Sequence, residues 1–352
     1  MDKKTTIIDL FSGCGGLSYG FQREGFDVKL AIDNWGDALK TFAKNHPGTQ
    51  IMHADLSKIT PEETVSHFLL TKTGIDVIIG GPPCQGFSIS GKRNVDDPRN
   101  KLYKAFLKFV KYFKPKVFLI ENVPNLVSMA QGRVKEEILQ NFQELGYNTI
   151  YKILTASEYG VPQNRKRVFF IGLRSTTKFD FPETTHGRNK KLIITIKDAI
   201  DDLPENTLPE GSEYPSQPIT EYQKKIRGYS QAVYNHRATI HNPRTINIIK
   251  LVPDGGNYKN LPKNLQNTRR VNIAWTRMNS NKPSYTIDTG HNHHFHYKYN
   301  RVLTPRESAR IQSFPDQFIF IGNHTSQLKQ IGNAVPPILA QQLAKKIKKF
   351  LK

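Results

Sequence analysis

Apolar and polar residues alternate along the first 175 residues in the rhythm of strands and helices. Short apolar runs predict strands, and longer stretches with apolar residues every three or four positions predict helices between them. The strands are expected at 6–10, 28–32, 50–52, 76–79, 116–120, 149–154 and 168–171, and the helices at 36–45, 61–70, 101–113 and 134–145. This β-α-β order predicts an α/β fold with a doubly wound, mostly parallel sheet covered on both faces.

The periodic pattern is lost between 176 and 300, where Pro, Asn, Gly and Tyr are frequent. It returns at Thr304-Pro305, which predicts a helix start. The segment from Pro337 onward has apolar residues at every fourth position, which favours a helix docked on the main domain over one lying on a membrane surface. We expect a large domain over 1–180, completed by 300–352, and a smaller, loop-rich domain over 181–299.

Charge divides the loop-rich stretch into two parts. The whole chain has a formal net charge of +21, residues 176–221 carry a net −4, and residues 222–300 carry a net +11. The basic part also holds nine aromatic residues, including Trp275. Because lysine and arginine attract phosphates and aromatic rings stack on bases, this part favours contact with nucleic acid. A lysine-coated soluble protein is the alternative that charge alone leaves open.

Cysteine content and hydropathy restrict the cellular setting. Cys14 and Cys84 are too few for a disulfide framework or a four-cysteine zinc site. No apolar signal region and no window of about 18 apolar residues is present, so we expect a cytoplasmic protein that does not enter a membrane. The histidines at 291–296 have only Asp288 near them, and we expect no metal.

A glycine-rich turn follows the first expected strand and reads Asp9-Leu10-Phe11-Ser12-Gly13-Cys14-Gly15-Gly16-Leu17. Such a turn lets backbone N–H groups at a helix start face a ligand. Ser18 stands where a dinucleotide fingerprint needs glycine. Asp33 ends the second strand, where a carboxylate can accept from ribose hydroxyls, and Asp55 ends the third, where it can meet an adenine amino group. Together they predict a nucleoside cofactor without a diphosphate; a plain turn between packed elements is the alternative.

Three further motifs follow or precede expected strands. Gly80-Gly81-Pro82-Pro83-Cys84-Gln85 follows the 76–79 strand and places a candidate nucleophile over the crevice at the strand ends; a buried structural cysteine is the alternative. Glu121-Asn122-Val123 adds a carboxylate to the same crevice, unless it is an ordinary loop residue. In Gln163-Asn164-Arg165-Lys166-Arg167 the two arginines share one face of an extended segment, as they would also in a simple phosphate-binding patch.

Taken together and in this order, the segments resemble the cytosine-C5 DNA methyltransferase family. The turn at 11–16 is similar to the family's cofactor loop, and Pro82-Pro83-Cys84-Gln85 to its nucleophile loop. The Glu121 and Gln163 motifs resemble the next two family blocks, and 306–316 and 330–337 the last two. The resemblance implies a Rossmann-like, class I S-adenosylmethionine-dependent methyltransferase fold, with a target-recognition domain over 181–299.

The resemblance also implies the reaction, methylation of carbon 5 of cytosine within a short DNA sequence. The Cys84 thiolate is expected to add to carbon 6 of a flipped-out cytosine, after which carbon 5 attacks the methyl group of S-adenosylmethionine and leaves S-adenosylhomocysteine. Glu121 is expected to hydrogen-bond N3 of the base. Arg165 is expected to hold the base carbonyl, and Arg167 to support Arg165 or hold phosphate. No residue identifies itself as the base that removes the C5 proton.

Matching positions extend the expected sites. The cofactor contacts are expected at Phe11, Gly13, Gly15, Leu17, Asp33, Asn34, Asp55, Leu56, Pro82, Leu102, Asn333 and Ala334. The loop 85–99 is expected to close over the site and fill the space that the flipped base leaves, with DNA contacts from Gln85, Ser88, Ser90, Lys92, Arg93 and Arg99. In the basic stretch, Arg269, Arg270 and Arg277 are candidates for contact with base edges. The partner is double-stranded DNA, and a cognate restriction endonuclease would act on the same site without stable binding. We expect a monomer that is the modification arm of a restriction-modification system.

Three other functions fit parts of the pattern. A related RNA methyltransferase would share the architecture, but the signatures of the tRNA-modifying branch are not found and the basic insert suits duplex DNA. A non-catalytic DNA-binding relative would not need Cys84, Glu121 and Arg165. An NAD-dependent oxidoreductase would need glycine in place of Ser18.

Overall fold

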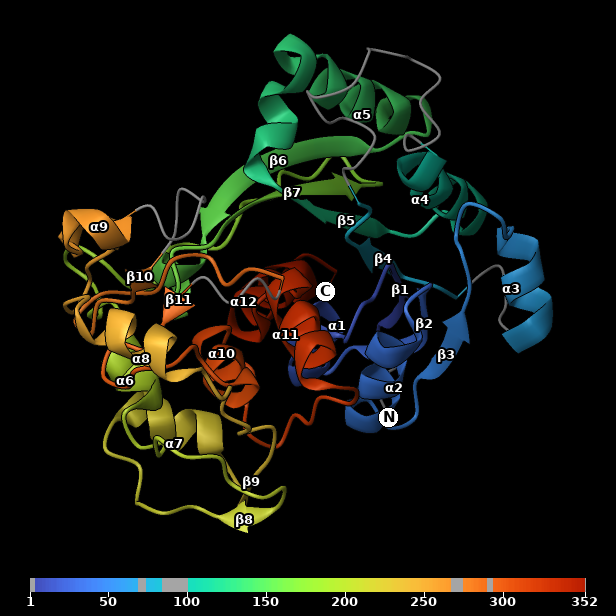
Figure 1. Ribbon diagram of the computed structural model, residues 1–352. Helices are drawn as coiled ribbons and strands as arrows, with labels where there is room; N and C mark the ends of the chain where they lie inside the picture. Colours follow the sequence, from blue (N-terminus) through green and yellow to red (C-terminus); the bar gives the residue numbers. More distant parts are fainter. Residues whose placement is uncertain (1–3, 69–73, 84–100, 267–274, 290–293, 352) are drawn as a thin grey trace. The chain divides into compact units, whose positions relative to one another are not determined.

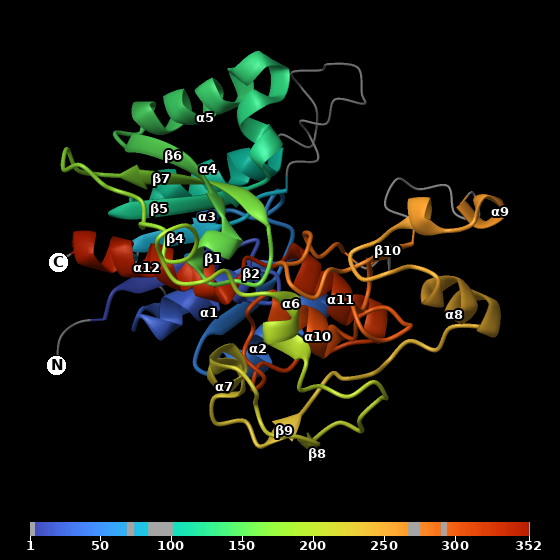
Figure 2. The same cartoon turned by 90° about the vertical axis from the view of Figure 1, so that its left-hand side faces the viewer.

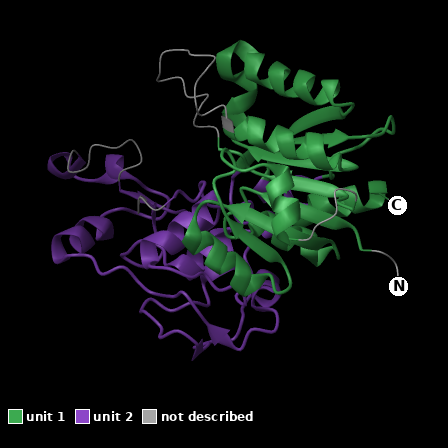
Figure 3. Cartoon of the chain, turned by 90° about the vertical axis from the view of Figure 1, so that its right-hand side faces the viewer, with its two compact units in different colours: residues 1–155, 166–183, 339–352 green, residues 156–165, 184–338 purple. Residues whose placement is uncertain are grey.

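The computed structural model describes residues 4–68, 74–83, 101–266, 275–289 and 294–351. The chain forms two compact units, which Figure 3 distinguishes by colour. Unit 1 comprises residues 1–155, 166–183 and 339–352, and unit 2 comprises residues 156–165 and 184–338. The expected division into a catalytic and a target-recognition domain concerns function and stays a prediction.

Unit 1 is built on a seven-stranded sheet with the order β3-β2-β1-β4-β5-β7-β6 (Figure 1). Its strands from β1 to β5 pair in parallel, while β7 pairs antiparallel with both β5 and β6. The predicted α/β fold with a mostly parallel sheet is therefore confirmed. The strands are β1 (Thr6–Leu10), β2 (Asp27–Asp33), β3 (Gln50–His53), β4 (Val77–Gly80), β5 (Val117–Asn122), β6 (Asn148–Thr155) and β7 (Lys166–Leu173).

Helices connect these strands much as the apolar spacing predicts. The predicted bounds of α2 and α4 agree with the structure, and α5 begins and ends one residue earlier than expected. The helical segments are α1 (Gly16–Arg23), α2 (Gly36–Asn45), α3 (Pro61–Phe68), α4 (Lys101–Phe113), the 3₁₀ segment η3 (Pro124–Gly132), α5 (Arg133–Glu144) and α12 (Pro337–Leu351), whose first two residues belong to unit 2.

The core of unit 1 lies between the sheet and its helices. Phe106 and Phe109 of α4 and Phe142 of α5 pack with Phe118 of β5 and Phe170 of β7. The helix α5 runs alongside β6 (Figure 2). Burial of such aromatic side chains contributes on the order of 2–3 kcal/mol each, so this layer holds β5 and its carboxyl end in place.

The C-terminal helix packs on α1. A Cβ atom added to Gly20 of α1 would lie 2.4 Å from the Cβ atom of Ala340, so only glycine permits this approach. Leu339, Leu343 and Ile347 are buried. The predicted docking of this helix on the main domain is confirmed.

Unit 2 contains short elements joined by long loops. The capping box of α10, with Thr304 at the N-cap, bears out the predicted helix start. The elements are η4 (Ala156–Tyr159), α6 (Ile196–Ile200), β8 (Ser212–Glu213), α7 (Glu221–Arg227), β9 (Ala232–Val233), α8 (Pro243–Lys250), η5 (Tyr258–Asn260), α9 (Lys263–Gln266), β10 (Thr276–Arg277), β11 (His294–Phe295), α10 (Pro305–Ile311) and α11 (His324–Asn333).

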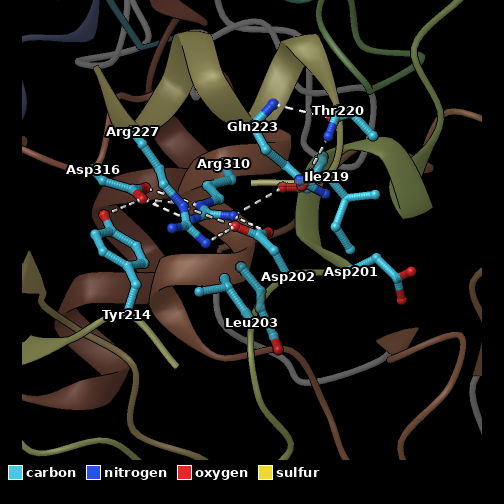
Figure 4. A network of polar contacts seen from close by, with 12 residues as sticks. Asp201, Asp202, Leu203, Tyr214, Ile219, Thr220, Gln223, Arg227, Arg310 and Asp316 are labelled. Carbon is cyan, nitrogen blue, oxygen red and sulfur yellow. Dashed lines mark hydrogen bonds and ion pairs between the residues drawn. The ribbon is translucent and has the colours of Figure 1, made fainter. Parts of the chain in front are cut away.

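A buried charge network joins distant segments of unit 2 (Figure 4). Arg310 donates to both carboxylate oxygens of Asp316, at 2.9 Å from Nε and 2.7 Å from Nη2, and also pairs with Asp202. Arg227 donates to Asp202 over 3.0 Å and lies 3.8 Å above the Tyr214 ring. Burial opposes ionisation of Asp316, but the attraction of Arg310 and Arg306 lowers the pKa of its carboxyl to about 2. The loops of unit 2 are thus held by charge-assisted hydrogen bonds.

Replacing Arg310 by Met should lower the free energy of unfolding by about 3–5 kcal/mol, because it leaves the buried carboxylates of Asp202 and Asp316 without their shared cation. Urea denaturation at neutral pH measures this loss. As a control, Lys224→Met removes an exposed ion pair with Glu221 and should change stability little. Equal stability of the Arg310 variant and the wild type would contradict this role of the network.

Candidate active site

The turn after β1 has the backbone of a ligand-binding loop. Phe11, Gly13 and Gly15 have φ values of 58°, 54° and 92°, in the left-handed region. Among the described residues other than Ser12 and Cys14, no atom lies within 4 Å of the place where a Cβ atom of Gly13 would stand. The hydroxyl of Ser12 is buried and accepts and donates no hydrogen bond within the described part of the chain. The loop therefore presents open space and an unused polar atom next to the start of α1.

Asp33, at the end of β2, organises this loop. Its Oδ2 accepts from the N–H of Gly13 over 2.8 Å, and its Oδ1 accepts from the N–H of Trp35 over 2.8 Å. Burial raises the pKa of Asp33 against the opposing effect of these donors. Because each carboxylate oxygen has two acceptor sites, Asp33 retains capacity for a hydroxyl group.

Asp55 lies two residues beyond β3, and its carboxylate binds neighbouring residues of the same loop. Its Oδ1 accepts from the N–H of Ser57 over 3.0 Å and from the Ser57 hydroxyl over 2.7 Å, and Lys58 lies 3.6 Å from Oδ2. The hydrogen bonds from Ser57 lower the pKa of Asp55. Contact with an adenine amino group therefore stays a prediction that depends on Oδ2.

Asp9 is a buried carboxyl beneath the loop that sequence reasoning did not single out. It is 1% exposed, and its Oδ2 accepts from the hydroxyl of Ser18 over 2.5 Å. Burial raises the pKa of Asp9 to about 8, against the Ser18 hydrogen bond and with a contribution from Asp33. The serine that replaces the dinucleotide-fingerprint glycine thus serves to hold a carboxyl group of the core.

A second group of residues gathers at the carboxyl ends of β4 and β5. The Glu121 carboxylate lies beside Gly81, since a Cβ atom on that glycine would stand 3.1 Å from Glu121 Oε2. Arg167 Nε lies 2.9 Å from Glu121 Oε1, and both side chains are largely buried. Asn122 Nδ2 donates to the Pro82 carbonyl over 3.0 Å. Gly81 and Pro82, which precede Cys84 in the sequence, are therefore held next to an oriented carboxylate.

Arg165 belongs to unit 2 and is 1% exposed. Its carbonyl accepts from the N–H of Ala156 over 2.8 Å, and the neighbouring Asn164 N–H donates to Ser284 O over 2.9 Å. Arg167 belongs to unit 1, where its partner is Glu121. The structure thus assigns a partner to Arg167 that the sequence expectation, support of Arg165 or phosphate binding, does not include.

The other expected cofactor residues occupy varied positions. Leu17, Leu56 and Pro82 are buried, Leu102 lies half-buried on α4, and Asn34 is exposed after β2. In unit 2, Asn333 is exposed at the end of α11 and Ala334 follows it half-buried. Several expected residues lie outside the described part of the chain: Cys84, Gln85, Ser88, Ser90, Lys92, Arg93, Arg99, Arg269 and Arg270.

Arg277 occupies a position that argues against the expected DNA contact. It is 4% exposed, and its Nε donates to Val252 O over 2.7 Å. Nη1 donates to His296 O over 2.9 Å, and Nη2 donates to Ile249 O over 2.8 Å. These bonds tie the end of α8 to the loop after β11. A base edge could be reached only by breaking them, so we assign Arg277 to the packing of unit 2.

A family model of known proteins matches almost the whole chain. The model of the C-5 cytosine-specific DNA methylases matches residues 5–349. The chain belongs to this family. It is therefore a DNA (cytosine-5)-methyltransferase, as the sequence resemblance implies, and the oxidoreductase alternative is excluded. The family transfers a methyl group from S-adenosylmethionine.

Similar proteins cover nearly the whole chain. Type II methyltransferase M1.HphI of Haemophilus parahaemolyticus is 38% identical over 98% of this chain and 87% of its own length. Type II methyltransferase M.DdeI of Desulfomicrobium norvegicum is 39% identical over 97% of this chain and 88% of its own length. A prophage-encoded protein of E. coli, assigned as a DNA modification methyltransferase, superposes with a TM-score of 0.82 at 30% identity over 99% of both chains.

A DNMT2 protein of Spodoptera frugiperda shares the fold, with a TM-score of 0.62 at 17% identity over 98% of this chain and 100% of its own.

In the described residues no helix is long and apolar enough to span a membrane. No group of three or more metal-ligating side chains occurs among the residues that the structure describes.

Replacing Asp9 by Asn should flatten the pH dependence of stability. A carboxyl whose pKa is raised on folding contributes stability that is present below pH about 4 and is lost as the pH rises through about 8. Chemical denaturation at pH 5, 6, 7 and 8 should show the wild type losing stability across this window and the Asp9→Asn protein losing less. Asp180→Asn, at an exposed carboxyl, is the control. Parallel curves for all three proteins would contradict a protonated Asp9.

Proposed function

We propose that the chain methylates cytosine in one short, specific sequence of double-stranded DNA, through a covalent adduct on Cys84. The observation that carries this proposal is the group at the ends of β4 and β5. The Glu121 carboxylate, held by Arg167, lies beside the Gly81-Pro82 segment that leads directly to Cys84. A nucleophile and an oriented acid-base group at one strand edge suit attack on a heterocycle.

The turn after β1 fits the nucleoside end of S-adenosylmethionine. Asp33 can accept from ribose hydroxyls, the open space at Gly13 admits close approach, and the Ser12 hydroxyl lacks a partner among the described residues. These residues would hold the molecule, with Leu17, Leu56 and Pro82 as apolar surroundings. When bound, it supplies the methyl group.

The chain's own residues would then act on the cytosine. The base must leave the stack, because a thiolate cannot reach carbon 6 inside a duplex. Cys84 adds to carbon 6, Glu121 hydrogen-bonds N3 as charge enters the ring, and Arg165 holds the base carbonyl. Arg167 orients Glu121 through its ion pair. Loss of the C5 proton and of the thiolate restores the ring.

The biological setting is proposed from the relatives. The similar proteins from Haemophilus and Desulfomicrobium are named Type II methyltransferases, and these support a modification enzyme paired with an endonuclease that acts on the same site. The basic stretch 222–300 supplies charge for DNA contact. We propose that the enzyme acts as a monomer on cytoplasmic DNA.

Expression in a host without cytosine methylation tests the proposed function. Methylation-sensitive sequencing should show 5-methylcytosine at one short motif, and replacing Cys84 by Ala should abolish it, because the adduct is lost. The Asp180→Asn protein, which is changed at an exposed carboxyl, is the control and should keep methylating.

No mark on any cytosine, from a protein that binds S-adenosylmethionine, would shift the assignment to RNA methylation. Methylation that persists in the Cys84→Ala protein would contradict the covalent mechanism.

A further inference from the structure

Two buried glutamines form a chain of hydrogen bonds through unit 2. Gln163 and Gln312 are both 0% exposed, and they lie 149 positions apart in the sequence. Gln163 Nε2 donates to Gln312 Oε1. At one end, the N–H of Ile287 donates to Gln163 Oε1 over 3.0 Å. At the other end, Gln312 Nε2 donates to the carbonyls of Ile331 and Ala334, over 3.2 and 2.6 Å.

The direction of this chain is fixed by its ends. The Ile287 N–H can only donate, so Gln163 must turn its oxygen toward it and its nitrogen toward Gln312. The carbonyls of Ile331 and Ala334 can only accept, so Gln312 must turn its nitrogen toward them. Each side-chain amide thus uses both its oxygen and its nitrogen, and no other orientation of the two amides satisfies the Ile287 N–H and the two carbonyls together. We call this pair the amide relay.

The Gln163 end of the amide relay holds the segment that contains Arg165. The N–H of Asn164 donates to Ser284 O over 2.9 Å, and the N–H of Ser284 donates to Pro162 O over 2.9 Å. Together with the Ile287 bond, these contacts join 162–165 to 284–287. The fully buried Arg165 follows this junction directly.

The Gln312 end holds the last turn of α11, where Asn333 and Ala334 stand. A second contact joins this turn to the same region. A Cβ atom on Gly332 would lie 2.1 Å from Asp288 O, so the helix end packs directly on the backbone that follows Ile287. The segment 284–289 therefore contacts Gln163 directly and, through Gly332, also contacts the helix turn that Gln312 holds.

We propose that Gln163 and Gln312 are positioning residues that couple the base-holding segment around Arg165 to the cofactor segment at Asn333 and Ala334. The proposal rests on the proposed function, which assigns the ligands of the two segments. Segments joined by buried hydrogen bonds shift together, because a shift of one segment alone would leave a buried amide group unpaired. A shift of the segment at one end of the relay therefore changes the position of the segment at the other end.

The test replaces each glutamine by Met, which keeps the side-chain length and removes the hydrogen bonds. Binding is then measured for the ligand that the segment at the other end of the relay contacts. Gln163→Met should weaken binding of S-adenosylhomocysteine about tenfold by calorimetry, although Gln163 belongs to the base side. Gln312→Met should lower base flipping to a similar extent. The probe is the fluorescence of 2-aminopurine at the target position of a duplex, measured without cofactor.

The control is Gln223→Met. Gln223 is also buried in unit 2, but in the described part of the chain its Oε1 accepts from the nearby N–H groups of Ile219 and Thr220 at the start of α7. This variant should lose thermal stability comparably while it keeps both affinities per folded molecule. For each ligand, the double variant Gln163→Met/Gln312→Met should lose no more affinity than the single variant that binds that ligand less tightly. Either substitution alone already breaks the hydrogen bond between the two glutamines, so the second adds no further loss.

Variants of Gln163 and Gln312 that behave like Gln223→Met would overturn the proposal, as would losses that multiply in the double variant. Failure of the proposed function looks different. In that case the wild-type protein itself would not bind S-adenosylhomocysteine, or would leave no 5-methylcytosine in DNA.

Discussion

Parallel pairing of β1 with β2 and β4, and of β4 with β5, is the constraint on which the rest of the molecule depends. Parallel strands end at one edge of a sheet, so segments far apart in the sequence reach the same crevice. The places of the glycine turn, Asp33, the Gly81-Pro82 segment and Glu121 all follow from this, and Arg167 reaches Glu121 because β7 pairs antiparallel with β5. Apolar packing of α4 and α5 on the sheet holds the carboxyl ends of the strands in place. The residues expected to bind the ligands and to react lie at these strand ends or follow them in the sequence.

Unit 2 is stabilised in a different way, because its short helices and two-residue strands form few backbone ladders. Buried arginines replace them. Arg310 joins Asp202 and Asp316, Arg301 forms a bidentate pair with Glu307 at 2.8 Å, and Arg277 collects backbone carbonyls. Such bonds fix irregular backbone in one conformation, since an unpaired buried charge is costly. The amide relay adds neutral, directional links in the same unit.

The sequence predicted best what local pattern determines. The strand 6–10, the helices α2 and α4 and the edge that carries Asp33 and Glu121 follow from apolar periodicity and from turns. Pairings between distant residues leave no such signal. The basic neighbours of Arg277 suggested DNA contact, whereas its burial depends on carbonyls of α8 and the loop after β11. Gln163 and Gln312 stood within quoted motifs, but nothing local indicates that they meet across 149 positions. Asp9 likewise stood in the quoted glycine-turn motif, but nothing local indicates that its carboxyl is buried against the Ser18 hydroxyl.

The covalent mechanism requires that the Cys84 thiolate adds to the cytosine ring. A duplex carrying 5-fluorocytosine at the target position tests it directly, because fluorine blocks the elimination that would release the enzyme. With S-adenosylmethionine, we expect a protein–DNA complex that survives denaturation, in which the peptide bound to DNA contains Cys84. A methylated fluorocytosine with no stable complex, or an adduct on another residue, would contradict it.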